Sequence, residues 1–259
     1  MDVLNEEGIK IFQQQVGQLG WISQQTRPDI AFETLSLSTR QKKASFSELK
    51  EANKVLERAK ATSLRLRFNK VKSDFEEWTF WVFADAAFAL LSDKTKSSEG
   101  RFLLLVNERT LDFHVINWKA GVIAKVCNDV KTAETHAMMN AISEAVYVRD
   151  ILKQAIGTKV KIKVFTDSNS LRDSIHSTNL AQNKMVRLTI ASIKQLLSEG
   201  DVNRILWVPT KFQLADILTK KGVCPDLLKS MFKAGKLNEF FNNTQYLQER
   251  EENQTIPSA

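Results

Sequence analysis

The chain has 259 residues, of which 43% are hydrophobic, so it can form one sizeable domain with appendages and is not a disordered protein. Its net charge of +7 favours a polyanionic partner, although an excess of this size is also common in proteins that bind no nucleic acid. The two cysteines, Cys127 and Cys224, lie far apart in the sequence, which argues against a structural zinc site and fits a reducing compartment. Both are expected to be packing residues.

The opening residues lack the basic and apolar regions of a signal peptide, and no apolar stretch approaches the roughly 20 residues of a membrane span. We therefore expect no association with a membrane. The expected location is the cytoplasm, with later entry into the nucleus as the alternative.

Residues 1–75 are expected to be helical and basic. The clearest helix spans 46–60, begins at Ser45 or Ser47, and carries apolar residues at helical spacing. A solvated helix face would explain the basic residues, and a surface that follows a phosphate backbone is the functional alternative. These basic residues are Lys42, Lys43, Lys50, Lys54, Arg58, Lys60, Arg65, Arg67, Lys70 and Lys72.

From Glu77 onward the pattern changes to strands. The segments 78–88, 100–106 and 111–118 are separated by short polar turns and predict an antiparallel meander. Helices and strands then alternate, which implies that the later strands join the sheet in parallel. The expected elements are a helix at 130–156, a strand at 160–166, helices at 169–177 and 183–199, and a strand at 204–208.

A last helix of this region is expected at 211–220. Thr210 would be its N-cap, Gln213 follows at the spacing of a capping box, and Gly222 would end it. A further helix is expected at 225–236, and the tail from residue 242 is polar enough to be flexible.

Asp85 lies within the apolar segment 78–88 and has no charged neighbour in the sequence. Removing water from an unpaired carboxylate costs several kcal/mol, so a cation or a proton should offset its burial. A carboxylate in the middle of a strand has no helix to cap and no partner at helical spacing. Asp85 is therefore the strongest candidate for a functional acid.

Glu134, Asp167 and Asp216 each have an ordinary explanation. Glu134 would favour the N-terminus of its helix, Asp167 would cap the helix that follows it, and Asp216 would be a surface charge paired with Lys220. The alternative is that Glu134, on the apolar face of its helix, and Asp167, at the end of a parallel strand, converge with the other two acids at one mouth of the sheet.

Four converging carboxylates would repel one another unless divalent cations neutralised them. Hard oxygen ligands select magnesium or manganese. Two such ions about 4 Å apart would suit the hydrolysis of a phosphodiester. The acids therefore predict a metal site built from oxygen ligands.

Each acid lies in a distinctive sequence. These are Val-Phe-Ala-Asp-Ala-Ala-Phe-Ala (82–89), Thr-Ala-Glu-Thr (132–135), Phe-Thr-Asp-Ser-Asn-Ser-Leu (165–171) and Trp-Val-Pro-Thr-Lys-Phe-Gln-Leu-Ala-Asp-Ile-Leu-Thr-Lys-Lys-Gly (207–222). In this order they resemble the ribonuclease H domain of copia-like retrotransposon Pol polyproteins. Residues 17–32 and 51–56 resemble the stretch that joins a copia-type polymerase palm to that domain.

The resemblance implies an α/β fold, with a ribonuclease H-like mixed five-stranded sheet flanked by helices and preceded by a helical extension. The sheet would consist of an antiparallel meander followed by parallel strands. The implied divisions are a helical connection segment at 1–75, the ribonuclease H-like domain at 76–222, and a C-terminal helix with a flexible tail at 223–259.

The resemblance also implies a metal-dependent endonuclease that cleaves the RNA strand of RNA/DNA hybrids. Two Mg²⁺ ions, or Mn²⁺, would be held by the four acids, and a location in a virus-like particle becomes a further alternative. The implied ligands are Asp85, Glu134, Asp167 and Asp216, and the residues expected to contact nucleic acid are Ser168, Asn169, Lys184, Arg187 and Lys211.

The chain departs from the family pattern in two places. Residues 183–188 stand where many copia-like elements carry a Lys-His pair, and 119–131 lack the family's polar, Ser/Thr-rich character. His114 and His136 are expected to be ordinary packing or surface residues, and His176 lies too early to act as the histidine that cellular ribonucleases H place before the last aspartate.

No Asp-Asp pair occurs in the chain, so we expect no polymerase activity. Two alternatives to an active nuclease remain. One is an inactive or host-adopted transposon remnant that binds nucleic acid or a protein. The other is a structural extension of a reverse transcriptase or Pol chain supplied separately.

Overall fold

The computed structural model describes residues 3–68, 70–71, 75–89, 91, 95–179, 181 and 183–237. The chain begins with a group of three helices, α1 (Glu6–Gln25), α2 (Ala31–Ser38) and α3 (Phe46–Ala61), with short 3-10 turns η1 (Pro28–Ile30) and η2 (Gln41–Lys43) between them. Ser45 begins α3 through a capping box with Glu48, which decides between the two expected starts. The group encloses an apolar core that includes Phe12, Leu19 and Leu37.

A five-stranded sheet follows the short turn η3 (Phe75–Glu77), and its strand order is β3-β2-β1-β4-β5. β1 pairs antiparallel with β2 and β2 antiparallel with β3, whereas β1–β4 and β4–β5 are parallel. This confirms the expected meander with parallel additions, and it is the sheet that the resemblance implied. The strands are β1 (Trp78–Ala87), β2 (Ser98–Asn107), β3 (Phe113–Val122), β4 (Lys161–Thr166) and β5 (Arg204–Trp207).

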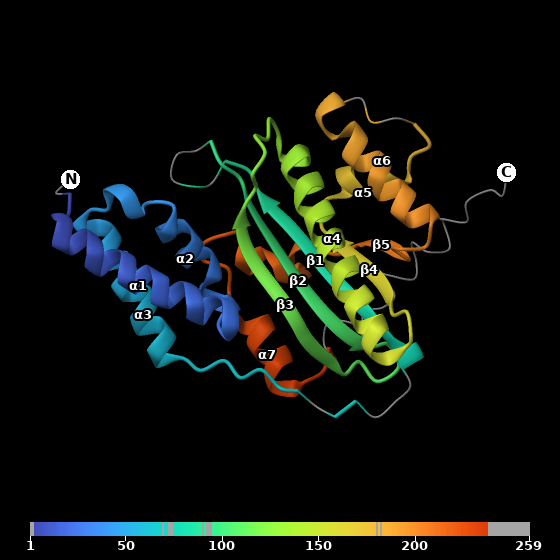
Figure 1. The fold of residues 1–259 in the computed structure, drawn as a ribbon, viewed down its shortest axis with the longest axis horizontal. Helices are drawn as coiled ribbons and strands as arrows, with labels where there is room; N and C mark the ends of the chain where they lie inside the picture. Colours follow the sequence, from blue (N-terminus) through green and yellow to red (C-terminus); the bar gives the residue numbers. More distant parts are fainter. Residues whose placement is uncertain are drawn as a thin grey trace.

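Helices cover both faces of this sheet (Figure 1). On one face α4 (Val130–Ile156), α5 (Asn169–His176) and α6 (Lys184–Ser198) enclose an apolar cluster with β1, β2 and β4. On the other face the cluster is closed by α7 (Asp226–Ala234) and by the 3-10 helix η5 (Leu214–Leu218), and it includes Ala31 of α2. The helical extension is therefore packed onto the sheet domain.

Two expected elements differ from the structure. The segment 211–220 forms no α-helix but two 3-10 helices, η4 (Thr210–Phe212) and η5. The amides of Asp216 and Thr219 donate to carbonyls three residues back, those of Gln213 and Asp216, which tightens the turn, and every residue of Leu214–Leu218 is buried. The expected N-cap, Thr210, is also wrong, since the side chain of Gln213 caps η5 by accepting a hydrogen bond from the Ala215 amide.

The second difference concerns β3. The strand extends to Val122, because residues 119–122 continue the ladder with β2, and this includes the start of the segment that departs from the family pattern.

Of the cysteines, Cys127 is buried as expected, but Cys224 is exposed, so its assignment as a packing residue is wrong. The expected flexible tail lies outside the described residues, and none of the described helices is long and apolar enough to span a membrane.

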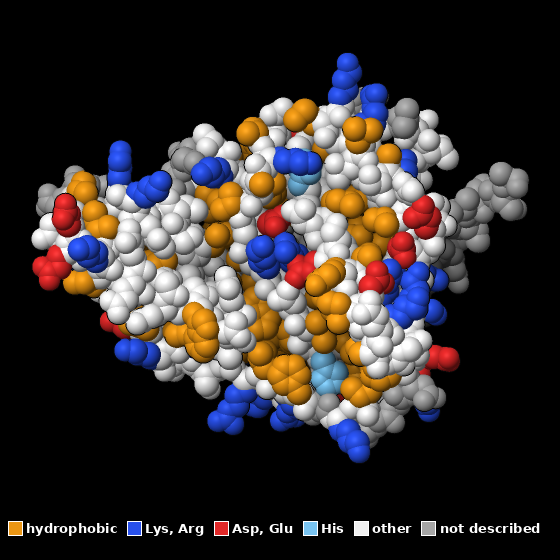
Figure 2. All heavy atoms as spheres, in the orientation of Figure 1, with side chains coloured by type: hydrophobic (Ala, Val, Ile, Leu, Met, Phe, Trp, Pro, Cys, Tyr) orange, Lys and Arg blue, Asp and Glu red, His pale blue; other side chains and the backbone are white. Residues whose placement is uncertain are grey.

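Basic side chains do not form one stripe on the face seen in Figure 2. They lie at separate places around its rim, with one further group near the middle beside acidic side chains. In the helical extension some basic side chains are paired with acids, such as Arg58 with Glu33 and Arg40 with Glu48.

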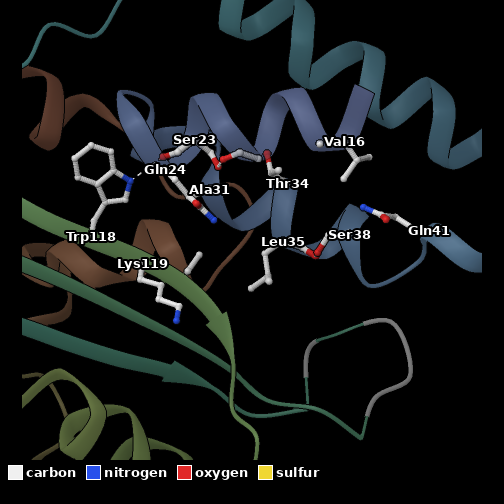
Figure 3. A pocket seen from close by; sticks show the side chains of 13 residues that line it. Val16, Ser23, Gln24, Ala31, Thr34, Leu35, Ser38, Gln41, Trp118 and Lys119 are labelled. Atoms are coloured by element: carbon white, nitrogen blue, oxygen red, sulfur yellow. Dashed lines mark hydrogen bonds between the residues drawn. The ribbon is translucent and has the colours of Figure 1, made fainter. Parts of the chain in front are cut away.

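A groove of about 240 Å³ lies where α1 and α2 meet the edge strand β3 (Figure 3). The indole of Trp118 donates a hydrogen bond of 2.8 Å to the Ser23 carbonyl at this junction. None of the residues that line the groove is acidic. The groove is therefore separate from the acids described next.

Candidate active site

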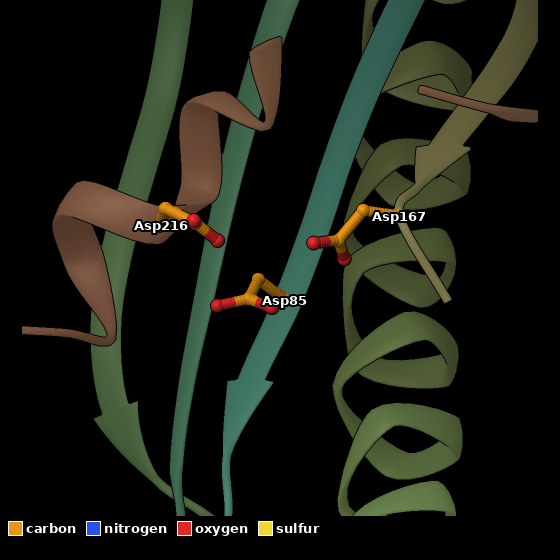
Figure 4. Close-up of side chains that lie close together, drawn as sticks. All are labelled: Asp85, Asp167 and Asp216. Atoms are coloured by element: carbon orange, nitrogen blue, oxygen red, sulfur yellow. The ribbon is translucent and has the colours of Figure 1, made fainter. Parts of the chain in front are cut away.

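Three aspartates meet at one end of the sheet (Figure 4). Asp85 lies in β1, Asp167 directly follows β4, and Asp216 lies in η5. The register pairs Phe83 of β1 with Phe165 of β4, so Asp85 and Asp167 lie level on neighbouring parallel strands. One carboxylate oxygen from each aspartate lies within 4.8 Å of those of the other two.

Asp85 is 1% exposed and has two partners from the segment after η5. The Thr219 hydroxyl donates a short hydrogen bond to its Oδ2, and the Lys220 ammonium lies 3.4 Å from the same oxygen. Burial raises the pKa of Asp85 from 3.8 to about 7, against the opposing effect of Lys220 and with further increases from Asp216 and Asp167. The cation expected beside Asp85 is thus supplied by Lys220, a pairing that the sequence reasoning missed.

Asp216 is 7% exposed, so the ordinary interpretation of a surface charge is wrong, although its expected pairing with Lys220 is present. The Lys220 ammonium lies 2.8 Å from Asp216 Oδ1. Burial raises the pKa of Asp216, while the hydrogen bond and the charge of Lys220 act in the opposite direction. Lys220 therefore bridges Asp85 and Asp216.

Asp167 does not cap the helix that follows it. The side chain of Ser168 is the N-cap of α5 and accepts the hydrogen bond of the Leu171 amide. The carboxylate of Asp167 instead accepts a hydrogen bond of 2.9 Å from the Thr210 hydroxyl, and its backbone carbonyl accepts one of 3.0 Å from the Trp207 indole. Its side chain is thereby directed toward Asp85 and Asp216.

Glu134 lies in α4, whose N-cap is Asp129, and its inward orientation agrees with the expectation from its apolar face. The residue is 7% exposed. Burial, then the charges of Asp85 and Asp167, raise the pKa of Glu134 well above its ordinary value. Glu134 is not among the three acids within 4.8 Å, but its carboxylate is close enough to be affected by all of them.

The residues expected to contact nucleic acid lie on α5, α6 and η4. Lys184, Asn169 and Lys211 are exposed, and the ammonium of Lys211 lies 4.8 Å from the centre of the Phe212 ring. The guanidinium of Arg187 is partly engaged, because its Nε donates to the Ala181 carbonyl at 2.9 Å. Ser168 is used as the cap of α5.

Four residues outside the predicted set position the acids: Gly100, Thr210, Gln213 and Thr219. Gly100 is the β2 residue that pairs with Asp85, and a Cβ there would lie 2.8 Å from the Ala215 carbonyl oxygen. The amide of Gln213 donates to the Ala84 carbonyl at 3.1 Å. Thr210, Gln213 and Thr219 lie within the last predicted motif, and Gly100 lies outside the motifs in β2. The sequence indicated capping roles for Thr210 and Gln213, but nothing in it pointed to their contacts with Asp167 and β1 or to the roles of Gly100 and Thr219.

The histidines are placed as expected. His114 is buried and stacks on Trp78 with ring centroids 5.4 Å apart. His136 is a buried residue of α4 and is affected by the charge of Glu99 in β2. Neither belongs to the aspartate cluster.

No protein-family model matches the chain, and no curated protein matches it. Among solved structures, the N-terminal RNase H domain of a Mycobacterium tuberculosis protein, fused to maltose binding protein, is 16% identical, with a TM-score of 0.40 over 61% of this chain and 95% of that one. An RNase H1 isolated from compost by a metagenomic approach, in complex with an RNA/DNA hybrid, is 14% identical, with a TM-score of 0.41 over 54% and 94%.

A foamy viral protease-reverse transcriptase in complex with double-stranded DNA is 14% identical, with a TM-score of 0.31. That match covers 83% of this chain and 36% of the viral one. At identities and TM-scores of this size, none of these similarities carries an argument about the activity or substrate of this chain. The chemistry is therefore derived from its own acids.

Proposed function

We propose that the chain is a divalent-metal-dependent endonuclease that cleaves the RNA strand of RNA/DNA hybrids. The observation that carries the proposal is the meeting of Asp85, Asp167 and Asp216 at one end of the sheet, with Glu134 buried beside them. Burial and mutual repulsion both disfavour the charged forms of these acids, so their convergence favours the binding of a cation.

The donor set fits a hard divalent cation. Carboxylate oxygens are the ligands that magnesium and manganese prefer, and the four acids offer only such oxygens. Asp85, Asp167 and Asp216 would hold the ions, with Glu134 completing the set. Bound there, the ions would supply a water of lowered pKa and stabilise the leaving oxygen of a phosphodiester.

The surrounding residues orient the acids. Thr219 directs one oxygen of Asp85, and Thr210 directs one oxygen of Asp167. Because both donors are neutral, they fix orientation without removing the negative charge that a cation needs. Lys184, Arg187 and Lys211, with the polar side chains of Ser168 and Asn169, would bind phosphate and sugar groups of the hybrid.

The proposals on origin, metal ion, partner and location rest on the resemblance of the motifs to copia-like Pol polyproteins. We propose an origin in a copia-like retrotransposon Pol polyprotein, magnesium as the ion, a polymerase-bearing Pol chain as a partner, and a cytoplasmic location. The chain's own α1 to α3 would then serve as the connection to that partner.

Lys220 gives specific support to a second candidate, an inactive or host-adopted domain that binds nucleic acid or a protein partner. Its ammonium already neutralises part of the charge of Asp85 and Asp216, so the acids can be retained without a metal. Activity on a hybrid distinguishes the two candidates.

The deciding experiment is cleavage of a hybrid with end-labelled RNA in magnesium, compared with single-stranded RNA, duplex RNA and duplex DNA. Cleavage of the hybrid that stops in chelator is expected. Asp85→Asn should reduce it by several orders of magnitude, and Asp226→Asn, which changes an exposed aspartate of α7, should not. Binding of the hybrid without cleavage by the wild type would favour the second candidate.

A further inference from the structure

Lys220 occupies an unusual place for a lysine. Its ammonium lies between two buried acids, 2.8 Å from Asp216 Oδ1 and 3.4 Å from Asp85 Oδ2, while 35% of its side chain remains exposed. A metal ion bound by Asp85 and Asp216 would draw on the same two carboxylates. The ammonium therefore interacts with groups that a divalent ion would bind.

The backbone around Lys220 is held firmly on both sides. The Lys220 amide donates to the Asp216 carbonyl at 3.0 Å, and the Thr219 carbonyl accepts a hydrogen bond of 3.3 Å from the Ser98 hydroxyl. The absence of a side chain at Gly100 allows this segment to approach β2. By contrast, the side chain of Lys220 is long and partly exposed, so its ammonium can leave the oxygens without any change in the backbone.

In the metal-free protein, the positive charge of the ammonium offsets the repulsion among the acids. The charges of Asp85, Asp167 and Asp216 act on Glu134, those of Asp167 and Asp216 act on Asp85, and the charge of Lys220 opposes these effects. Burial would lower the pKa of Lys220, but Asp85 and Asp216 raise it above its ordinary value, so the side chain stays charged.

We propose that Lys220 is a displaceable counter-cation, which stabilises the aspartate cluster in the metal-free protein and competes with a divalent ion for the oxygens of Asp85 and Asp216. The inference rests on the proposed function, because it concerns the same metal site. The competition follows from charge, since an ammonium and a divalent ion repel each other when they share oxygens. Lys220 would thus set the metal concentration at which the site fills.

The test compares Lys220→Gln with Lys221→Gln. Both variants lose one positive charge, but Lys221 is 69% exposed and pairs with Glu51 at 2.6 Å, away from the aspartates. Binding of Mn²⁺ is measured by calorimetry, and thermal melts are recorded in chelator. Lys220→Arg, which keeps the charge, is the conservative variant.

Lys220→Gln is expected to bind Mn²⁺ with a Kd at least tenfold lower than that of the wild type, a change of about 1.4 kcal/mol. Its melting temperature in chelator should be below those of the wild type and of Lys221→Gln. Lys221→Gln and Lys220→Arg should both keep a Kd close to that of the wild type. If Lys220 had only a structural role, Lys220→Gln would lower the melting temperature without lowering the Kd for Mn²⁺.

If Lys220→Gln does not fold in chelator, its Kd is measured by back-titrating the manganese-loaded protein with chelator. A Kd equal to or higher than that of Lys221→Gln overturns the competition while leaving the proposed nuclease standing. Absence of Mn²⁺ binding in every protein, wild type included, contradicts the proposed metal site and overturns the competition with it.

Discussion

At the scale of single residues, Asp85 is the acid whose environment differs most from water. It is 1% exposed, and burial raises its pKa to about 7. Its two partners, Thr219 and Lys220, come from a segment more than a hundred positions later in the chain. Its ionisation is therefore coupled to the docking of that segment on the sheet.

The raised pKa predicts how stability depends on pH in the absence of metal. The folded protein holds the Asp85 proton more tightly than the unfolded chain does, so protonated Asp85 contributes to the free energy of unfolding. This contribution is fully present below pH 3.8 and is lost as the pH rises through about 7. Asp216 and Glu134, whose pKa values are also raised, add to the same trend. In chelator, the melting temperature of the wild type should fall from pH 4 to pH 7 relative to that of Asp85→Asn.

The difference should reach at least about 2 °C, which corresponds to ~1 kcal/mol for a domain of this size. Thermal melts across this pH range, with Asp226→Asn as the matched control, provide the measurement. Parallel curves for the wild type and Asp85→Asn would contradict the assignment.

Asp216 gives a prediction that does not require activity. In chelator, Asp216→Asn should be neutral or stabilising, because it removes one of the repelling charges while its amide oxygen can still accept a hydrogen bond from Lys220. With magnesium at ten times Kd the wild type should gain about 1.4 kcal/mol, and the variant should gain less because it has lost a ligand. Paired melts with chelator and with magnesium measure both effects, and equal metal-induced shifts would exclude Asp216 as a ligand.

At the scale of elements, the close contact between β2 and η5 positions the site. A Cβ at Gly100 would lie 2.7 Å from the Thr219 side chain and 2.8 Å from both the Ala215 carbonyl oxygen and Leu218 Cβ. Backbone and buried atoms of this kind cannot move aside cheaply. The glycine therefore allows Asp216 and Lys220 to reach Asp85.

Gly100→Ala is accordingly expected to destabilise the fold by about 1–3 kcal/mol and to reduce the stabilisation by magnesium, because η5 must move away from β1. Gly17→Ala is the matched control: nothing lies within 4 Å of a Cβ at that helical position, and the substitution should stabilise α1 by about 0.5–1 kcal/mol. Denaturant unfolding of both variants provides the test. Wild-type stability in Gly100→Ala would show that η5 is not constrained there.

At the scale of the whole molecule, the net charge of +7 is distributed without a continuous basic stripe on the face seen in Figure 2. Binding of a hybrid should therefore depend on basic residues near the acids rather than on the total charge. Lys184 and Lys10 are both exposed, but Lys184 begins α6 beside the sheet domain, and Lys10 lies on α1 of the helical extension.

We expect hybrid binding to weaken with salt, and Lys184→Gln to reduce the slope of log Kd against log salt by about 1, whereas Lys10→Gln should leave it unchanged. Titrations of a fluorescent hybrid at several salt concentrations measure these slopes. A flat salt response of the wild type, or the same change of slope in both variants, would contradict a phosphate contact at Lys184.

Much of the architecture was predictable because its causes are local. The capping box of Ser45, the apolar runs of β1 and β4, and the alternation of helices and strands act over a few residues. They led to the expected antiparallel meander followed by parallel strands, whereas the number of strands followed from the family resemblance. Local pattern also singled out Asp85, because a carboxylate in an apolar strand is conspicuous in the sequence itself. Glu134, Asp167 and Asp216 each kept an ordinary local explanation, and the family resemblance grouped them with Asp85.

The remaining features depended on contacts between distant segments. The hydrogen bond between Thr219 and Asp85 joins residues 134 positions apart. The approach of η5 to Gly100 likewise depends on the packing of this late segment against the sheet. The buried segment 214–218 is also a 3-10 helix where local capping signals had indicated an α-helix. Periodicity and capping report only on neighbours within a few residues, so the pairing of Lys220 with Asp85 was decided by tertiary packing alone.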